Sequence, residues 1–216
     1  MLIVIDGIYS AGKSSIIASL ASRLHEKHGR DVFVSDWNSS ELVGELIPRW
    51  KRTGRLKAYS LLHAEALDLA YRCETEIEPR LAAGEIVVTD RYAASGMARA
   101  VIRGADRALA AAAFGFAPAE TCTVLVECDP VTTLERRKAL GKVLDGYHSG
   151  RDFRRGSSVE SDFVDYQRQM AALYRELVAS RGACLRVDTT EDVPTLVELR
   201  RWRSPTWDAS INNFGF

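Results

Sequence analysis

Near its N-terminus the chain reads Gly7-Ile8-Tyr9-Ser10-Ala11-Gly12-Lys13-Ser14, which matches the pattern G-x-x-x-x-G-K-[S/T]. The apolar run Leu2–Asp6 directly before it predicts a buried strand. Directly after it, Lys13–His28 has apolar residues at helical spacing and is followed by Gly29, a typical end of a helix. A glycine-rich turn between a strand and a helix is typical of a phosphate-binding loop.

The residue types of this loop suit the binding of a polyphosphate. Glycines allow the backbone to aim successive N–H groups inward, and the positive end of the following helix dipole points to the same place. Lys13 supplies a point charge for the β- and γ-phosphates, and the hydroxyl of Ser14 is a ligand that Mg²⁺ accepts. The predicted nucleotide-binding residues are Gly7, Tyr9, Ser10, Ala11, Gly12, Lys13, Ser14 and Ser15.

Composition narrows the class of protein. The 216 residues include 29 basic and 29 acidic side chains, so the formal net charge is zero, which argues against broad nucleic-acid binding. No apolar run approaches the ~20 residues that span a membrane, and the start of the chain lacks the features of a signal peptide. Four scattered cysteines without a C-x-x-C pair predict reduced, mostly buried thiols in a cytoplasmic protein.

Along the rest of the chain, apolar runs alternate with helical patterns, which predicts a single α/β domain over residues 1–216. A parallel sheet of about five strands is expected, with helices on both faces. The expected strands are Leu2–Asp6, Val32–Ser35, Glu85–Asp90, Thr123–Asp129 and Cys184–Asp188. The expected helices are Lys13–His28, Leu56–Ala83 with Pro79 as a kink or a new start, Arg99–Phe114 with a break at Gly104, Pro130–Leu140, Val159–Ser180 and Asp192–Trp202.

A second polar motif, Asp90-Arg91-Tyr92, ends the third predicted strand. Ligands of open parallel sheets bind beyond the carboxyl ends of the strands, so Asp90 is expected to face the same crevice as the glycine-rich loop. A carboxylate there can hold Mg²⁺ through water, and an arginine can clamp a phosphate. The alternative is that Asp90 caps a helix and Arg91 lies at the surface.

With these motifs in place, the chain resembles the thymidylate kinase family of P-loop nucleoside monophosphate kinases over residues 1 to about 200. The resemblance rests on the loop at 7–15, on Asp90-Arg91-Tyr92 with Ala93-Ala94-Ser95-Gly96, on Glu78–Gly84, on Asp129-Pro130 with Leu134–Arg137, and on Phe163–Tyr174. It implies an ATP donor, Mg²⁺ held by Ser14 and Asp90, direct phosphoryl transfer, a mobile lid, and in many members a homodimer.

By position, the lid is Gly141–Ser158, where hydrophobic periodicity is lost and glycines and basic residues gather. Arginines of a lid close over phosphates, neutralise developing charge and exclude water. The candidates are Arg137, Arg151, Arg154 and Arg155, each with the alternative of a solvated surface charge. The resemblance also places the segment at Asp188 near the adenine, and the tail 203–216 is expected to be irregular.

The half of the site that binds the acceptor departs from the family pattern. Tyr9 stands where the family has an acidic residue that serves the acceptor sugar, and Ser35-Asp36-Trp37-Asn38 replaces an Arg-Glu-Pro segment. On the acceptor helix, His63 and Leu67 stand where the family has an aromatic residue and an arginine, and a shift of two residues restores no arginine.

These departures leave two roles open for the residues around Asp36. Asp36 could be a general base for an alcohol acceptor, with Trp37 as a stacking platform. Alternatively, Asp36 or Asn38 caps a helix that contains Glu41–Ile47. The predicted acceptor-binding residues are Tyr9, Trp37, His63, Arg91 and Tyr92, and the predicted catalytic residues are Lys13, Asp36, Asp90, Arg91, Arg137, Arg151 and Arg155.

The sequence therefore supports an ATP-dependent phosphotransferase that acts on a small nucleotide-type acceptor, with dTMP as the family default. The alternative is a P-loop kinase that phosphorylates a hydroxyl of a nucleoside, a hydroxymethylated base in DNA, or a specialised metabolite, with Asp36 as base. A polymeric acceptor would use Trp37 and Trp50-Lys51-Arg52, but the neutral total charge disfavours nucleic acid. A regulatory module without transfer activity is disfavoured by the complete loop and Asp90-Arg91.

Overall fold

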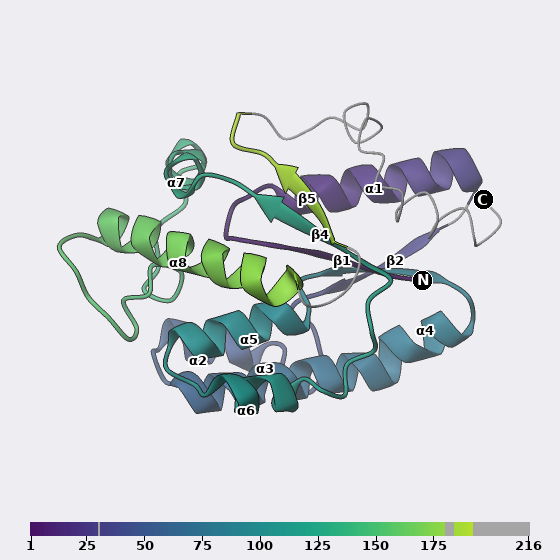
Figure 1. Ribbon diagram of the computed structural model, residues 1–216, viewed down its shortest axis with the longest axis horizontal. Coiled ribbons are helices and arrows are strands. Elements are labelled where there is room, and N and C mark those ends of the chain that lie inside the picture. Colours follow the sequence, from purple (N-terminus) through teal and green to yellow (C-terminus); the bar gives the residue numbers. More distant parts are fainter. Residues whose placement is uncertain (30, 180–183, 192–216) are drawn as a thin grey trace.

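A computed structural model describes residues 1–29, 31–179 and 184–191 (Figure 1). Within these residues, five strands form one parallel sheet in the order β2-β3-β1-β4-β5. The strands are β1 (Leu2–Gly7), β2 (Val32–Asp36), β3 (Ile86–Asp90), β4 (Cys122–Glu127) and β5 (Cys184–Asp188). The predicted α/β class and the predicted strands are confirmed, with shifts of a residue or two at several ends.

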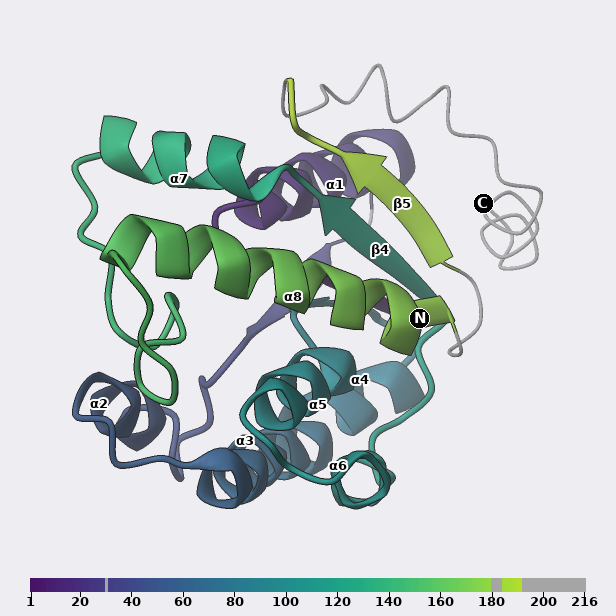
Figure 2. The same ribbon diagram turned by 60° about the vertical axis from the view of Figure 1, so that its left-hand side comes forward.

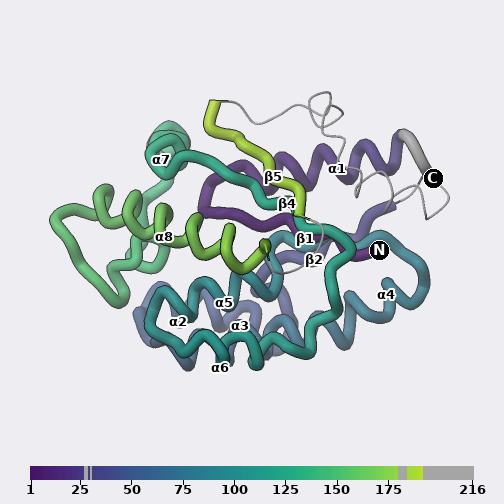
Figure 3. Tube along the Cα trace, in the orientation of Figure 1, coloured from purple at the N-terminus to yellow at the C-terminus, as the bar shows by residue number. Residues whose placement is uncertain are grey.

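Helices cover both faces of the sheet (Figures 1, 2 and 3). Ile3 and Ile5 of β1 point to one face and pack in a core that includes α1 (Lys13–His28). Leu2 and Val4 point to the other face, in a core with α3 (Ala58–Arg72) and α5 (Ala93–Ile102). The two faces of β1 are thus both buried, as expected for a central parallel strand.

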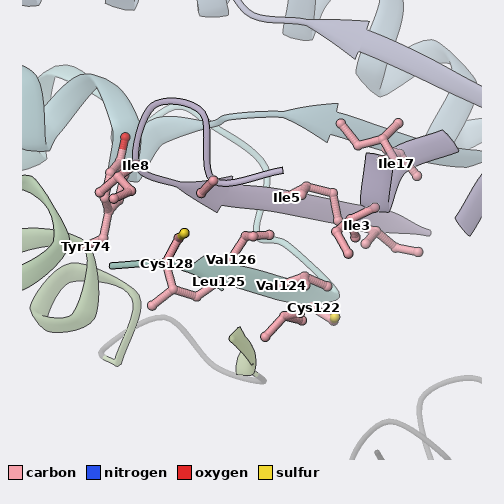
Figure 4. Packing of buried hydrophobic residues seen from close by; sticks show 14 of the residues in the cluster. Ile3, Ile5, Ile8, Ile17, Cys122, Val124, Leu125, Val126, Cys128 and Tyr174 are labelled. Atoms are coloured by element: carbon pink, nitrogen blue, oxygen red, sulfur yellow. The ribbon is translucent and has the colours of Figure 1, made fainter. Parts of the chain in front are cut away.

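The first core extends along β4 and reaches α8 (Val159–Ala179). Figure 4 shows Ile3 and Ile5 of β1 beside Val124 and Val126 of β4. Tyr174 of α8 lies at the loop end of this cluster, near Ile8. The apolar packing therefore holds the start of the glycine-rich loop against β4 and α8.

The predicted long helix Leu56–Ala83 is not regular throughout. It consists of α3, a π-helical turn η1 (Cys73–Ile77) and α4 (Glu78–Ala82), with Pro79 in the first turn of α4. Proline has no backbone N–H, and its ring crowds the carbonyl four residues earlier, so regular α-helical bonding cannot continue unbroken through this segment. The backbone stays helical from Ala58 to Ala82, so the segment continues through the π-helical turn and does not end before Pro79.

Two other helix predictions need correction. Residues 41–45 form turns, and the short helix α2 (Leu46–Arg52) has Glu45 at its N-cap position, so neither Asp36 nor Asn38 caps it. The predicted helix Arg99–Phe114 is divided into α5, which begins at Ala93, and α6 (Arg107–Ala113). Gly104, with φ of 99°, marks the break, as predicted, and Asp106 caps α6 by accepting from Leu109 N–H.

The helix α7 (Pro130–Ala139) begins at Pro130 as predicted, with Asp129 as its cap. Residues 140–158 contain turns and neither helix nor strand, in agreement with the irregular segment expected there. The predicted helix Asp192–Trp202 and the tail 203–216 lie outside the described residues. No helix among the described residues is long and apolar enough to cross a membrane. All four cysteines are free thiols, and three of them are buried.

The packing of α5 on α6 generates a stability prediction. A Cβ atom added at Gly96 of α5 would lie 2.2 Å from Cζ of the fully buried Phe114. We expect Gly96→Ala to lower the free energy of unfolding by about 1–2 kcal/mol, because overpacking outweighs the better helix propensity of alanine. Urea denaturation measures this change. Gly146→Ala is the control, since a Cβ there meets nothing within 4 Å, and equal stabilities of the two variants would contradict the prediction.

Candidate active site

A cleft of about 440 Å³ opens at the carboxyl edge of the sheet. This is the edge at which open parallel sheets bind their ligands. Its walls come from the glycine-rich loop, from the ends of β2 and β3, from α2 and α5, and from the predicted lid. The lining residues are Tyr9, Asp36, Trp37, Asn38, Pro48, Lys51, Arg52, Asp90, Arg91, Arg99, Asp145, Tyr147 and His148.

The glycine-rich loop begins with a position that admits only glycine. Gly7 has φ of 147°, and a Cβ there would lie 2.2 Å from the carbonyl oxygen of Val126 in β4. Gly12, with φ of 93°, directly precedes α1, whose first residue is Lys13. The N-terminus of α1 is thereby aimed across the loop, where N–H groups and the helix dipole attract anions.

Lys13 is folded back onto its own loop. Its ammonium group donates a hydrogen bond to the carbonyl of Ile8 at 3.0 Å, and the residue is buried. Burial, together with the nearby Arg91 guanidinium, lowers the pKa of Lys13 to about 7, although Asp90 and Asp6 oppose the shift. A phosphate placed in the loop would supply the negative charge that favours the protonated form.

The remaining loop residues present both backbone and hydroxyl groups. Ala11 is buried, and its carbonyl accepts from the hydroxyl of Thr189, which follows β5. Ser14 and Ser15, in the first turn of α1, are exposed. The hydroxyl of Ser14 is therefore accessible to a metal ion, whereas the position of Ala11 is fixed by the end of the sheet.

Arg91 is held in an unusual backbone conformation beside the loop. Its φ is 74°, a backbone conformation that residues with a side chain rarely adopt. Its guanidinium donates to the carbonyl of Gly7 at 2.7 Å and to the hydroxyl of Tyr174 at 2.8 Å. The Asp90 carboxylate lines the same cleft, and its Oδ1 has no hydrogen-bond partner among the described residues. The structure thus brings Asp90 and Arg91 to the same cleft as Tyr9 of the loop.

A buried polar network supports Arg91 from behind. Ser95 Oγ donates to the Asp6 carboxylate at 2.6 Å and lies 2.7 Å from the Tyr174 hydroxyl. The Asp6 carboxylate also accepts from Gly7 N–H, and it lies 3.8 Å from the Arg91 guanidinium. Burial raises the pKa of Asp6, although Arg91 and these hydrogen bonds oppose the shift. The network links β1, α5 and α8 to one arginine.

Hydrogen bonds to α3 hold the segment that follows β2 at the cleft. Asp36 pairs in register with Asp90 and is exposed at the cleft. The Asp68 carboxylate of α3 accepts from the N–H groups of Asn38, at 3.2 Å, and Ser40, at 3.0 Å. These bonds hold the turn at Asn38, where φ is 58°, and keep Asp36 and Trp37 at the edge of the cleft.

One wall of the cleft carries basic side chains, of which the sequence analysis connected Lys51 and Arg52 only with a polymeric acceptor and Arg99 with none. Lys51 and Arg52 of α2 and Arg99 of α5 line the cleft together with Arg91. The acceptor helix has Leu67 where the family has an arginine, and α2 and α5 supply positive charge to the cleft instead. Side chains from separate elements meet only in the folded protein, so no local sequence pattern predicts that they line one cleft.

The predicted lid lies against the glycine-rich loop. The His148 ring stacks on the Tyr9 ring with centroids 3.8 Å apart and planes 8° from parallel. The side-chain amide of Gln167 in α8 bridges the two segments: Gln167 Oε1 accepts from Tyr9 N–H, and Gln167 Nε2 donates to the His148 carbonyl. Burial lowers the pKa of His148 to about 4, although Asp145 opposes the shift, so the stacked ring is neutral at pH 7.

The four arginines predicted for lid function lie in different places. Arg137 is buried, with its guanidinium 4.5 Å from the centre of the Tyr9 ring and a hydrogen bond to the Val143 carbonyl. Arg151 pairs with Asp162 of α8 at 2.8 Å. Arg154 and Arg155 are exposed. Arg137 is therefore the one of these four that the structure places beside the glycine-rich loop.

Two predicted acceptor residues are not brought to the cleft. His63 is exposed on α3, and the side chain of α3 that reaches behind the cationic wall is Glu65, two residues later. Tyr92 is buried in the core and donates from its hydroxyl to the Pro118 carbonyl. Neither belongs to the lining of the described cleft. Tyr9, Trp37 and Arg91, in contrast, line it, and their role in acceptor binding stays a prediction.

Comparisons with known proteins agree with this arrangement. The model of the thymidylate kinase family matches residues 5–198. A probable thymidylate kinase 2 of Saccharolobus solfataricus is 29% identical over 190 residues, which cover 87% of each chain. A thymidylate kinase of Xanthomonas campestris pv. campestris is 36% identical over 141 residues, 65% of this chain and 62% of that relative.

The fold has a counterpart among solved structures. The crystal structure of a thymidylate kinase from Ehrlichia chaffeensis superimposes with a TM-score of 0.68, covering 93% of this chain and 96% of that one. The two sequences are 16% identical, so this likeness concerns the fold. The match of the family model, in contrast, runs from β1 through the glycine-rich loop, Asp90-Arg91 and α8, and so includes the site itself. This chain belongs to the thymidylate kinase family.

Proposed function

We propose that this chain transfers the γ-phosphoryl group of ATP to the phosphate of a nucleoside monophosphate, with dTMP as the first acceptor to test. The observation that carries the proposal is the cleft itself, which Tyr9 of the glycine-rich loop lines together with four basic side chains: Lys51, Arg52, Arg91 and Arg99. A phosphate acceptor is already a nucleophile and needs positive charge around it rather than a base.

On the donor side, the loop between Gly7 and Lys13 would hold the β- and γ-phosphates through its N–H groups. The Ser14 hydroxyl and the Asp90 carboxylate fit a magnesium ion, because one is exposed at the start of α1 and the other keeps an unpartnered oxygen among the described residues. Mg²⁺ bound there would neutralise phosphate charge. Both residues are oxygen donors of the kind that this ion prefers.

In this proposal, Lys13 leaves the Ile8 carbonyl and turns its ammonium group to the phosphates, where negative charge favours its protonated form. Arg91, fixed by Gly7 and Tyr174, supplies a rigid donor to the transferred group. Arg137 lies next to the loop and is the lid-side arginine for the same charge. Roles for Arg151 and Arg155 would require them to leave their present positions.

A second function has one observation in its favour, the exposed Asp36 carboxylate in the lining of the cleft. A base at this place suits a hydroxyl acceptor, which gives up a proton when it attacks. The basic wall formed by Lys51, Arg52 and Arg99 favours the phosphate acceptor instead. The proposal also includes a location in the cytoplasm, which the cysteine usage predicts, and a pairing of two identical chains, which the family implies.

Removing the lysine of the glycine-rich loop tests the donor site. We expect Lys13→Ala to abolish ATP-dependent transfer while the melting temperature changes little, because the ammonium group donates its hydrogen bond to a carbonyl of its own loop. Lys138→Ala is the control, since Lys138 pairs with Glu135 and Glu160 at the surface of α7. Labelled ATP measures transfer, and full activity of Lys13→Ala would overturn the assignment of the donor site.

An acceptor panel tests the chemistry of the second substrate. With labelled ATP and equal amounts of dTMP, other nucleoside monophosphates, nucleosides and hydroxymethylated DNA, we expect a monophosphate to be converted to a diphosphate fastest. The reason is the excess of guanidinium and ammonium groups on the cleft wall. Product that forms only from nucleosides or from DNA would contradict the proposal and support the alternative with a hydroxyl acceptor.

Replacing Asp36 separates the two functions by rate. With a phosphate acceptor, we expect Asp36→Asn to lower kcat by less than about 10-fold, because no proton has to be removed. A general base would instead cost ~10²–10⁴-fold in kcat. Asp165→Asn on the exposed face of α8 is the control. Steady-state kinetics with the best acceptor of the panel measures the effect.

A further inference from the structure

Behind the cationic wall of the cleft lies a carboxylate that neither the motifs nor the proposed function has used. Glu65 of α3 is fully buried. Its Oε1 accepts from the Lys51 ammonium at 2.6 Å, from the Arg99 guanidinium at 3.4 Å and from the Tyr147 hydroxyl at 3.5 Å. Three elements of the cleft wall, α2, α5 and the lid, therefore meet at one oxygen atom.

The cluster around Glu65 carries a net positive charge. Two cations face one carboxylate, and the side chains of Lys51 and Arg99 are only 9% and 7% exposed. Burial of ions costs solvation energy, and a buried ion cluster is weak evidence for a stabilising role. Both cations line the cleft, whereas Glu65 does not. The uncompensated positive charge is thus directed to the side from which a ligand enters.

We propose that Lys51 and Arg99 bind the phosphate of the acceptor as a pair, and that Glu65 is the positioning residue that holds this pair at the cleft wall. This inference rests on the proposed function, because it names the part of the cleft that recognises a monophosphate. It also assigns specificity, since a nucleoside without the phosphate would leave the pair uncompensated.

The geometry explains why the buried Glu65 carboxylate helps Lys51 and Arg99 to bind the phosphate of the acceptor. A free lysine and a free arginine each lose much rotamer freedom when they bind a ligand. Here the short bond to Glu65 fixes the Lys51 ammonium, which also lies 4.8 Å from the centre of the Tyr147 ring. Within the part of the chain that the structure describes, Glu65 accepts from one donor atom of each cation, and an ammonium and a guanidinium carry further N–H donors for phosphate oxygens.

The pair also predicts how acceptor binding depends on pH. The groups that face Lys51 are Glu65 of α3, Arg99 of α5 and Arg103 at the C-cap of that helix, and Tyr147 and His148 of the lid. Burial lowers the pKa of Lys51 to about 8, with Arg99 acting in the same direction and Glu65 opposing. Lys51 is charged below this pH and neutral above it, so affinity for the acceptor falls as the pH rises through about 8.

Removing the charge of Glu65 tests the proposal. We expect Glu65→Gln to weaken dTMP binding by ~10–100-fold, which is the effect of losing one hydrogen bond to a charged group. Thymidine binding and the KM for ATP should stay nearly unchanged. Isothermal titration of dTMP and of thymidine measures the ratio of the two affinities. Glu127→Gln is the matched control, because Glu127 also pairs with two arginines, Arg175 and Arg186, outside the cleft.

A second pair of variants keeps the test decisive if Glu65→Gln does not fold. We expect Lys51→Met to remove the preference for dTMP over thymidine, and Lys51→Arg to remove the fall in affinity near pH 8, because arginine stays charged. An unchanged preference in Lys51→Met would overturn the proposal. Equal affinities of the wild-type chain for dTMP and thymidine would overturn it as well, even if the acceptor panel confirms transfer from ATP.

Discussion

The structure depends on how Arg91 is held. Its guanidinium binds the carbonyl of Gly7, the first residue of the glycine-rich loop, and the hydroxyl of Tyr174. Its own N–H donates to the carbonyl of Ile5 in β1. The end of β3 is therefore fixed to the end of β1, and the loop that follows β1 cannot move without the arginine. The strained φ of 74° at this residue is accepted because so many bonds determine its position.

Much of the donor half was predictable because its signals are local. A strand, two glycines, a lysine and a helix follow one another within a few residues, and each constrains the next. Asp90 and Arg91 could be placed at the same edge because parallel strands end together. The strained conformation of Arg91 and the support from Asp6, Ser95 and Tyr174 could not be predicted, since they depend on contacts between elements far apart in sequence.

The acceptor half shows the limits of sequence patterns. The offset along the acceptor helix predicts His63 as a residue of the site. The helix instead presents Glu65 to the cleft wall, because a difference of two residues turns a side chain to another face of the helix. Tyr92 belonged to a correct motif, yet it packs inward because its neighbour Arg91 faces the loop. The capping roles of Asp36 and Asn38 failed because the helix after them starts later, at Leu46.

The bridge made by Gln167 has a consequence for how the two substrates influence each other. One side-chain amide binds the backbone of Tyr9 in the donor loop and that of His148 in the lid wall of the acceptor cleft. Any ligand that draws the Tyr9 N–H away from Gln167 weakens the hold on His148, and a ligand that displaces His148 weakens the hold on Tyr9. A coupling of this kind is reciprocal in free energy: an acceptor that loosened the bridge would change the affinity for the donor by the same factor as the donor would change the affinity for the acceptor.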